Sequence, residues 1–311
     1  MNVERATVEL LPLPPYDFDL ALAYLRTSPS AILERIDADG VYRRAVTLDG
    51  RDLLLTLRSV GSVAAPRLLL EVAGDRLDPA GVASAAALVT RIFSLRDDPA
   101  PFVALAARDP VLARLAGRYH GLRPVLIASP YEGLLWAIIG QQINVAFART
   151  LKRALVDLAG RRLALDGQEY PLSPTPDAVA GLDERALRER QFSRQKAAYL
   201  RDLSRAVADG ELDLAALGAR PYEDAVAALT RHKGIGRWTA EYVLMRGLGA
   251  PDSLPAADLG LRAIIGRAYG LARTATEAEV RQIAAAWAGR RGWAAFHWWL
   301  ALQEQTIDDR R

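Results

Sequence analysis

Apolar positions in the first hundred residues follow two different periods. Four short runs, apolar or alternating, predict β-strands: residues 3–11, 41–48, 53–58 and 67–72. Asp49-Gly50, between the second and third runs, is the signal of a two-residue hairpin turn. Residues 18–26 and 79–95 have helical spacing instead, the latter with a proline near its start. The pattern predicts a small antiparallel sheet covered by helices, an α+β unit.

Strand-like patterns end at Asp97-Asp98-Pro99-Ala100-Pro101. Eight later runs carry helical periodicity: residues 131–140, 146–158, 185–192, 195–208, 223–232, 239–247, 259–269 and 277–302. Short segments rich in Gly, Pro and Asp separate them. The sequence therefore predicts two parts, an α+β antiparallel-sheet domain at residues 1–100 and an all-α domain at residues 101–311.

The chain contains no cysteine among its 311 residues. Disulfides, thiolate nucleophiles and cysteine-ligated zinc or iron–sulfur sites are therefore excluded. Its histidines, His120, His232 and His297, are scattered and show no metal-ligand spacing, so we expect no metal site. The N-terminus has no basic-then-apolar leader, and no apolar run approaches the roughly 20 residues of a membrane span. We expect a cytoplasmic enzyme.

Net charge is +3, but it is unevenly distributed. Residues 1–100 carry 11 Lys and Arg against 14 Asp and Glu, which leaves 29 against 23 in the remainder of the chain. The excess of basic residues after residue 100 suits contacts with phosphates. A solvated arginine-rich surface would give the same count, so charge alone does not decide the partner.

The densest motif is a helix–turn–helix segment, Leu229-Thr230-Arg231-His232-Lys233-Gly234-Ile235-Gly236-Arg237-Trp238-Thr239-Ala240-Glu241-Tyr242. Its two glycines allow positive φ and leave the backbone bare, and Ile235 can fill the angle between the helices. The amides at residues 234–238 would then lie at a helix N-terminus, where they suit a phosphate of any DNA sequence. The alternative is an ordinary helix corner with a glycine C-cap.

A proline-containing loop follows, Asp252-Ser253-Leu254-Pro255-Ala256-Ala257-Asp258, and it delivers Asp258 to the start of the next helix. Alone, such an aspartate is usually an N-cap. The hairpin and the loop with its aspartate are together far more specific than either feature by itself.

This combination resembles the helix-hairpin-helix glycosylase superfamily, and within it the AlkA-type 3-methyladenine DNA glycosylase II family. Further segments have counterparts there in the same order: Pro14-Pro15-Tyr16-Asp17, Phe93-Ser94-Leu95, Asp98-Pro99 and Ile138-Ile139-Gly140-Gln141-Gln142. The resemblance covers nearly the whole chain. It implies a TATA-binding-protein-like N-terminal sheet, a helix-hairpin-helix glycosylase core, and a monomer that removes alkylated bases such as 3-methyladenine and 7-methylguanine from double-stranded DNA in base-excision repair.

The resemblance makes Asp258 the catalytic residue. One carboxylate suffices in principle, because it can stabilise the positive charge that builds on the sugar and can orient water. Trp238 stands where strand-cutting members carry a Schiff-base lysine, so the resemblance implies a glycosylase without lyase activity. Lys233 precedes the glycines and is expected to contact phosphate.

Four aromatic residues match positions that line the family's base pocket: Tyr24, Trp238, Tyr242 and Trp299. An aromatic cage attracts a cationic base through stacking and cation–π forces. Core packing is the alternative for each of them, and for Tyr24 the two interpretations are equally supported. Leu259 stands where relatives have an aromatic residue, which implies a roomier pocket.

The remaining expected DNA contacts lie in two segments. The hairpin contributes Lys233, Gly234, Ile235, Gly236 and Arg237, and Gln141 and Gln142 belong to the turn Gly140-Gln141-Gln142-Ile143-Asn144, which matches the wedge loop of the family. Gln142 replaces a leucine wedge of relatives, so it either bonds the orphaned partner base of a flipped nucleotide or is a polar interhelical turn residue. No cofactor is expected beyond a monovalent cation at the hairpin. A glycosylase for deaminated or oxidised bases, and a non-catalytic DNA-binding module, remain the alternatives.

Overall fold

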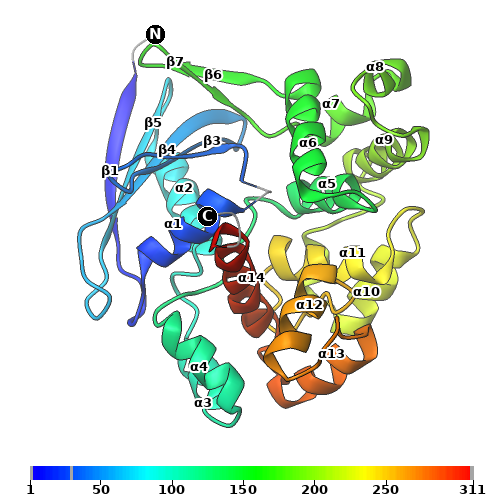
Figure 1. Cartoon of the computed structure of the whole chain (residues 1–311). Coiled ribbons are helices and arrows are strands. Elements are labelled where there is room, and N and C mark those ends of the chain that lie inside the picture. Colours follow the sequence, from blue (N-terminus) through cyan, green and yellow to red (C-terminus); the bar gives the residue numbers. More distant parts are fainter. Residues whose placement is uncertain (1–2, 29–30, 309–311) are drawn as a thin grey trace.

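The computed structural model describes residues 3–28 and 31–308 of the chain, and its N-terminal part is a five-stranded antiparallel sheet in the order β1-β5-β4-β3-β2 (Figure 1). The strands are β1 (Glu4–Leu10), β2 (Glu34–Ile36), β3 (Tyr42–Leu48), β4 (Arg51–Ser59) and β5 (Leu68–Gly74). Asp49 and Gly50 join β3 to β4 with φ angles of 50° and 74°, the left-handed pair that a type I′ hairpin requires. The predicted antiparallel sheet is confirmed, and β2 is an additional strand.

Two helices, α1 (Phe18–Thr27) and α2 (Pro79–Ile92), belong to this sheet. Each begins at an aspartate, Asp17 or Asp78, whose carboxylate accepts a hydrogen bond from a backbone N–H of the first turn. The inward leucines of β4 and the buried face of α2 belong to one hydrophobic core. This is the α+β arrangement that the apolar pattern predicts.

The rest of the chain is mostly helical. Its helices are α3 (Ala100–Ala106), α4 (Pro110–Arg118), α5 (Pro130–Gly140), α6 (Val145–Ala159), α7 (Pro176–Ala180), α8 (Glu184–Glu189), α9 (Arg194–Ala208), η1 (Ala216–Ala219), α10 (Tyr222–Thr230), α11 (Arg237–Tyr242), η2 (Val243–Gly247), α12 (Leu259–Ala268), α13 (Glu277–Ile283), η3 (Ala284–Trp287) and α14 (Arg291–Asp308). In Figure 1, α14 runs through the middle of the molecule, and it contacts both α1 and α12.

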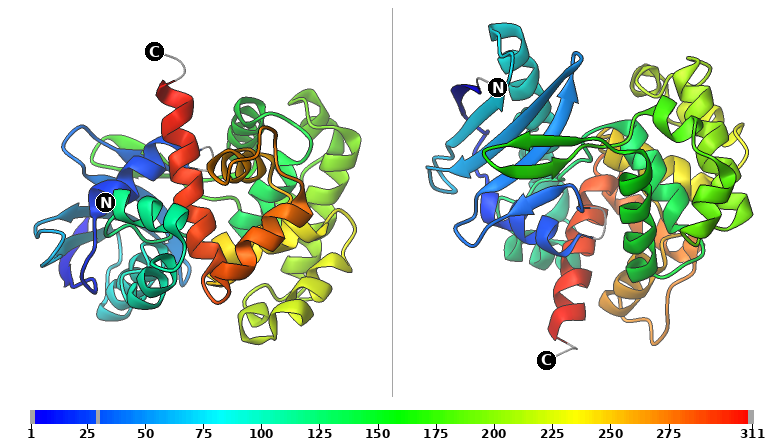
Figure 2. Two further views of the ribbon diagram at one scale, coloured as in Figure 1. Left: turned by 60° about the horizontal axis from the view of Figure 1, so that its bottom comes forward. Right: turned by 90° about the horizontal axis from the view of Figure 1, so that it is seen from above.

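The prediction that residues 101–311 are all-α is wrong in one place. Strands β6 (Arg162–Leu165) and β7 (Gln168–Pro171) form an antiparallel hairpin. Its turn is Asp166-Gly167, with φ angles of 53° and 72°, the same device that joins β3 to β4. Figure 2 shows the hairpin lying across the N-terminal sheet, where Leu165 and Tyr170 are buried against its second face. Burial against this sheet stabilises two strands too short to be stable alone.

The single helix predicted at residues 277–302 is interrupted. It comprises α13, the short 3₁₀ turn η3 and α14, with a break at residues 288–290. Gly289 lies in this break with a φ of 89°, a left-handed conformation that ends the helical path. Its N–H donates to Asp252, which fixes the break against the loop that carries Asp258.

One continuous core of buried side chains spans both parts of the chain. A buried ionic cluster also joins them, because Glu132 of α5 binds Arg44 of β3 and, at 3.2 Å, the ammonium of Lys152 in α6. The boundary near residue 100 therefore stays a prediction, since no separate core marks it. Among the described residues, no helix is long and apolar enough to cross a membrane.

Candidate active site

The hairpin lies between α10 and α11. Two features of the turn require a glycine at position 234. Its φ is 95°, and a Cβ atom there would lie 2.6 Å from ring carbons of Tyr199. Ile235 is only 5% exposed, as expected for the residue that fills the angle between the helices. Gly236 caps α11 without a side-chain hydrogen bond, which leaves the amides of the first turn available to an outside acceptor.

The next loop places Asp258 as the N-cap of α12. Its Oδ1 atom accepts hydrogen bonds from the Leu261 amide at 2.8 Å and from the Trp299 indole at 3.4 Å. Ser253 anchors the loop by donating to the backbone carbonyl of Glu241. Burial raises the pKa of Asp258, and the hydrogen bonds from Leu261 and Trp299 only partly oppose that rise. The carboxylate is therefore both an N-cap and a poorly solvated charge.

Trp299 and Trp238 lie beside this carboxylate, and the ring of Tyr242 lies next to both of theirs. The rings of Trp238 and Tyr242 lie 5.6 Å apart, and those of Tyr242 and Trp299 lie 5.9 Å apart. The indole N–H of Trp238 is buried without a hydrogen-bond partner, yet it lies near enough to Asp258 to lower the pKa of that carboxyl slightly. Segments far apart in sequence thus converge on one aspartate.

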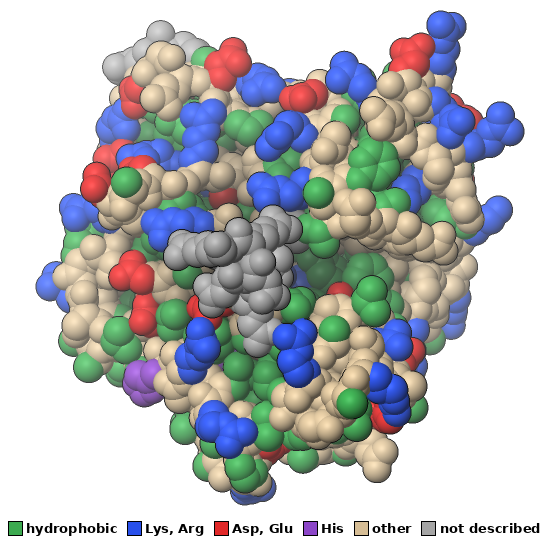
Figure 3. All heavy atoms as spheres, in the orientation of Figure 1, with side chains coloured by type: hydrophobic (Ala, Val, Ile, Leu, Met, Phe, Trp, Pro, Cys, Tyr) green, Lys and Arg blue, Asp and Glu red, His purple; other side chains and the backbone are tan. Residues whose placement is uncertain are grey.

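The other two predicted pocket residues lie differently. Tyr24 is 2% exposed and packs against Phe296 with ring centroids 4.3 Å apart, so it forms the wall behind Trp299 and does not reach the surface. Leu259, directly after Asp258, is 69% exposed. Figure 3 shows the molecule hollowed between α14, α12 and α11, with hydrophobic side chains in the hollow and Lys and Arg side chains around it.

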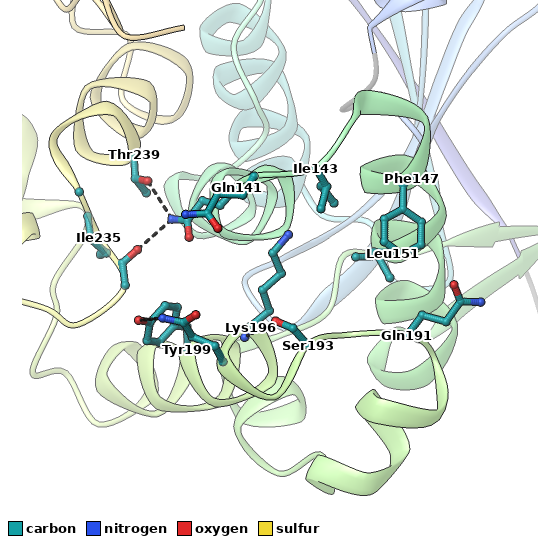
Figure 4. A pocket seen from close by; sticks show the side chains of 14 residues that line it. Gln141, Ile143, Phe147, Leu151, Gln191, Ser193, Lys196, Tyr199, Ile235 and Thr239 are labelled. Carbon is teal, nitrogen blue, oxygen red and sulfur yellow. Dashed lines mark hydrogen bonds between the residues drawn. The ribbon is translucent and has the colours of Figure 1, made fainter. Parts of the chain in front are cut away.

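A groove of about 610 Å³ lies on another side of the hairpin, between it, the wedge loop and α9 (Figure 4). The amide of Gln141 donates to the Gly234 carbonyl at 2.9 Å and to the Thr239 hydroxyl at 3.1 Å, so it fixes the hairpin to the wedge loop. Gln142 is exposed on the rim with a left-handed φ of 56°. Within the groove Lys196 donates to the Ile139 carbonyl, and burial lowers the pKa of its ammonium.

The two basic residues of the hairpin have different surroundings. Lys233 is exposed. Arg237 forms ion pairs with Glu223 at 2.8 Å and with the buried Glu241 at 2.9 Å. A DNA contact by the Arg237 guanidinium therefore competes with two carboxylates and stays a prediction. Asp252, in the loop that leads to Asp258, accepts hydrogen bonds from the Arg291 guanidinium and the Gly289 amide, as befits the loop residue that the sequence predicts.

Comparison with known proteins identifies the family. Residues 135–289 match the model described as HhH-GPD superfamily base excision DNA repair protein. DNA-3-methyladenine glycosylase 2 of Escherichia coli is 30% identical over 286 residues, which cover 92% of this chain and 94% of that protein. The chain belongs to the HhH-GPD superfamily. It is a DNA glycosylase of the 3-methyladenine glycosylase type, as the resemblance in the sequence predicts.

Two further relatives agree with this assignment. A DNA-3-methyladenine glycosylase of Bacillus subtilis is 35% identical over 210 residues, covering 68% of this chain and 69% of that protein. The solved 3-methyladenine DNA-glycosylase from Archaeoglobus fulgidus has a TM-score of 0.82 at 26% identity, and the match covers 96% of this chain and 99% of that one. The glycosylase fold therefore extends over both the sheet and the helical part.

One residue of this candidate site was not predicted from the sequence. Arg246, in the π-helical turn η2, is 2% exposed and lies against Tyr24 and Trp299. The only local signal is an arginine within an otherwise apolar run at residues 242–248. No group of three or more His, Asp or Glu side chains that could hold a metal occurs in residues 3–28 and 31–304. The monovalent cation at the hairpin carbonyls stays a prediction.

Proposed function

We propose that this glycosylase hydrolyses the N-glycosidic bond of alkylated bases in double-stranded DNA as a monomer, without cutting the strand. One observation carries the proposal: Asp258 is held at the N-terminus of α12 beside Trp299 and Trp238, and Tyr242 lies next to both of these rings. Its relatives named as DNA-3-methyladenine glycosylases support the choice of alkylated bases.

Asp258 acts on the sugar. As the C1′–N bond breaks, the base leaves with the electron pair and positive charge develops on the deoxyribose, where the nearby carboxylate stabilises it. A water molecule oriented by the same carboxylate then adds its oxygen to C1′, and its proton passes to Asp258 or to solvent. The ionised form is required, so the raised pKa of Asp258 predicts that activity declines in mild acid.

The aromatic side chains select the base. A nucleotide must leave the duplex to reach Asp258, because the reacting bond is inaccessible within the stack. A flipped base would then stack against Trp238, Tyr242 or Trp299. The exposed Leu259 at the mouth leaves this face of the pocket open to larger lesions. A base alkylated at a ring nitrogen is cationic and departs as a neutral molecule, so it needs little help from a general acid.

The hairpin and the wedge loop hold the DNA. Free amides at the start of α11 and the exposed Lys233 suit a phosphate, and they read no sequence. Gln142 stands at the tip of the wedge loop, where its amide can bond the orphaned base. Trp238 has no amine, so no Schiff base can form at that position, and the exposed Lys233 lies on the other side of the turn from α11.

Release of free base from methylated duplex DNA tests the proposal. Wild-type protein should release 3-methyladenine and 7-methylguanine and leave abasic sites, and Asp258→Asn should lower single-turnover release by at least about a hundredfold. Asp252→Asn is the matched control, because it removes a carboxylate of the same loop that is bound to Arg291. Equal release by wild type and Asp258→Asn, or none by either at any lesion, would refute it.

A further inference from the structure

Arg246 carries a positive charge inside the wall of the proposed base pocket. Its guanidinium carbon lies 5.0 Å from the centre of the Tyr24 ring, 5.4 Å from that of Phe296 and 5.7 Å from that of Trp299. Trp299 is shared, because its indole also donates to Asp258. The guanidinium therefore lies directly behind the side chain that touches the carboxylate.

This charge has little compensation within the protein. Nη1 donates to the Tyr24 hydroxyl, whereas Nε is buried and has no acceptor among the described residues. No ion pair joins Arg246 to an Asp or Glu in the described part of the chain. Within that same part of the chain, Nη2 has no hydrogen-bond acceptor either. A guanidinium with unused donors is costly to bury, so its presence here calls for an explanation.

The charge acts oppositely on two classes of lesion. A cationic base, such as 7-methylguanine, gives up its charge as it leaves, and a fixed cation nearby opposes its binding. An uncharged damaged base takes the electron pair of the C1′–N bond and becomes anionic until water protonates it. A cation behind the pocket stabilises that developing negative charge. The three rings around Arg246 are also partly occupied as cation–π acceptors before any base arrives.

We propose that Arg246 is a specificity-determining residue that shifts this site from cationic toward uncharged damaged bases. The inference rests on the proposed function, because it assumes that the flipped base lies against Trp299. Tyr24 would then be a positioning residue, because its hydroxyl is the one side-chain acceptor among the described residues that bonds the Arg246 guanidinium.

The test compares two duplexes of one sequence, one with 7-methylguanine and one with hypoxanthine, under single-turnover conditions. Arg246→Met should lower the rate of hypoxanthine release about tenfold more than the rate of 7-methylguanine release. Arg246→Lys keeps a positive charge, so its ratio of the two rates should stay close to that of the wild type. Arg123→Lys is the matched control. Arg123 is equally buried but donates to the carbonyls of Leu13, Pro15, Ser94 and Leu95, away from Asp258, so its replacement should leave the ratio unchanged.

Each outcome is decisive. Equal losses for both lesions in Arg246→Met would overturn the inference, as would a wild-type enzyme that releases 7-methylguanine but no hypoxanthine. A wild type that releases neither base would instead refute the proposed function. If Arg246→Met does not fold, Arg246→Lys and Tyr24→Phe remain. Tyr24→Phe removes the hydroxyl that orients Arg246 and should shift the ratio in the same direction by a smaller factor.

Discussion

Replacing the proposed catalytic aspartate should make the protein more stable. The pKa of Asp258 is raised, which means that its surroundings on balance disfavour the ionised form. Asn has the same shape and keeps an oxygen that can accept from the Leu261 amide, now 2.8 Å from Oδ1. Asp258→Asn therefore removes the buried charge and retains the cap. We expect its free energy of unfolding at pH 7.5 to exceed that of the wild type.

The capping bond sets the scale of the comparison. Asp258→Ala also removes the charge but loses the cap, which is worth about 1 kcal/mol. Asp258→Ala should thus be about 1 kcal/mol less stable than Asp258→Asn. Asp252→Asn, in contrast, should lower the free energy of unfolding relative to the wild type. Burial alone would raise the pKa of Asp252, but its bonds with Arg291 and the Gly289 amide outweigh burial and lower it. Losing that partly exposed pair should cost about 1 kcal/mol.

Urea unfolding of the four proteins at several pH values measures these differences. A carboxyl whose pKa is raised by folding makes the folded state less stable as the pH rises through the interval between its ordinary and its raised pKa. The advantage of Asp258→Asn should therefore be full at neutral pH, shrink as the pH falls from the raised pKa, and be lost below about pH 4, the ordinary pKa of aspartate. A variant less stable than the wild type at pH 7.5 would show that the helix dipole and the hydrogen bonds outweigh burial, and would refute the reasoning.

Three further predictions concern other residues. Gly234→Ala should lower the free energy of unfolding by about 2 kcal/mol, because the alanine would need a left-handed φ and its Cβ atom would lie 2.6 Å from the Tyr199 ring. Gly236→Ala is the control: its Cβ atom would have nothing within 4 Å, so the free energy of unfolding in the same urea assay should change by less than about 0.5 kcal/mol. Burial lowers the pKa of His297 to about 4, so the free energy of unfolding should fall by about 3 kcal/mol as the pH drops from 6.5 to 4. His297→Phe should lose this pH dependence, and the same dependence in that variant would contradict the prediction. Wild-type protein should give no borohydride-trapped adduct with abasic DNA, whereas Trp238→Lys should give one. An adduct with the wild type would show that another amine acts.

Much of the fold follows from local patterns in the sequence. Asp49-Gly50 predicts a hairpin, and the structure has it. Asp166-Gly167 carries the same signal, but its flanking strands of four residues are too short to stand out among helices. What stabilises them is burial of Leu165 and Tyr170 on the far face of the sheet, a contact between segments about a hundred residues apart. Such contacts leave no periodic trace in either segment.

The candidate site was predictable to a similar extent. The hairpin and Asp258 are local features, and the structure places Trp238 and Trp299 beside that carboxylate, with Tyr242 next to both rings. Helical periodicity does not separate Trp299 from Trp298, because both are buried in α14, and only the resemblance singles out Trp299. The sequence also cannot show that the Gln141 amide is used within the protein, on Gly234 and Thr239.

Arg246 shows why a residue of the candidate site can escape periodicity. Trp238, Tyr242 and Arg246 are spaced by four residues, and in an α-helix each step of four overshoots a full turn by about 40°. Two such steps would turn Arg246 well away from the tryptophan. The second step instead runs through the π turn η2, in which Leu248 N–H bonds the carbonyl of Val243, five residues earlier. The wider turn rotates the chain back, so Arg246 stays on the face that Trp238 and Tyr242 occupy, and one local change of helix type brings a cation to the wall of the pocket.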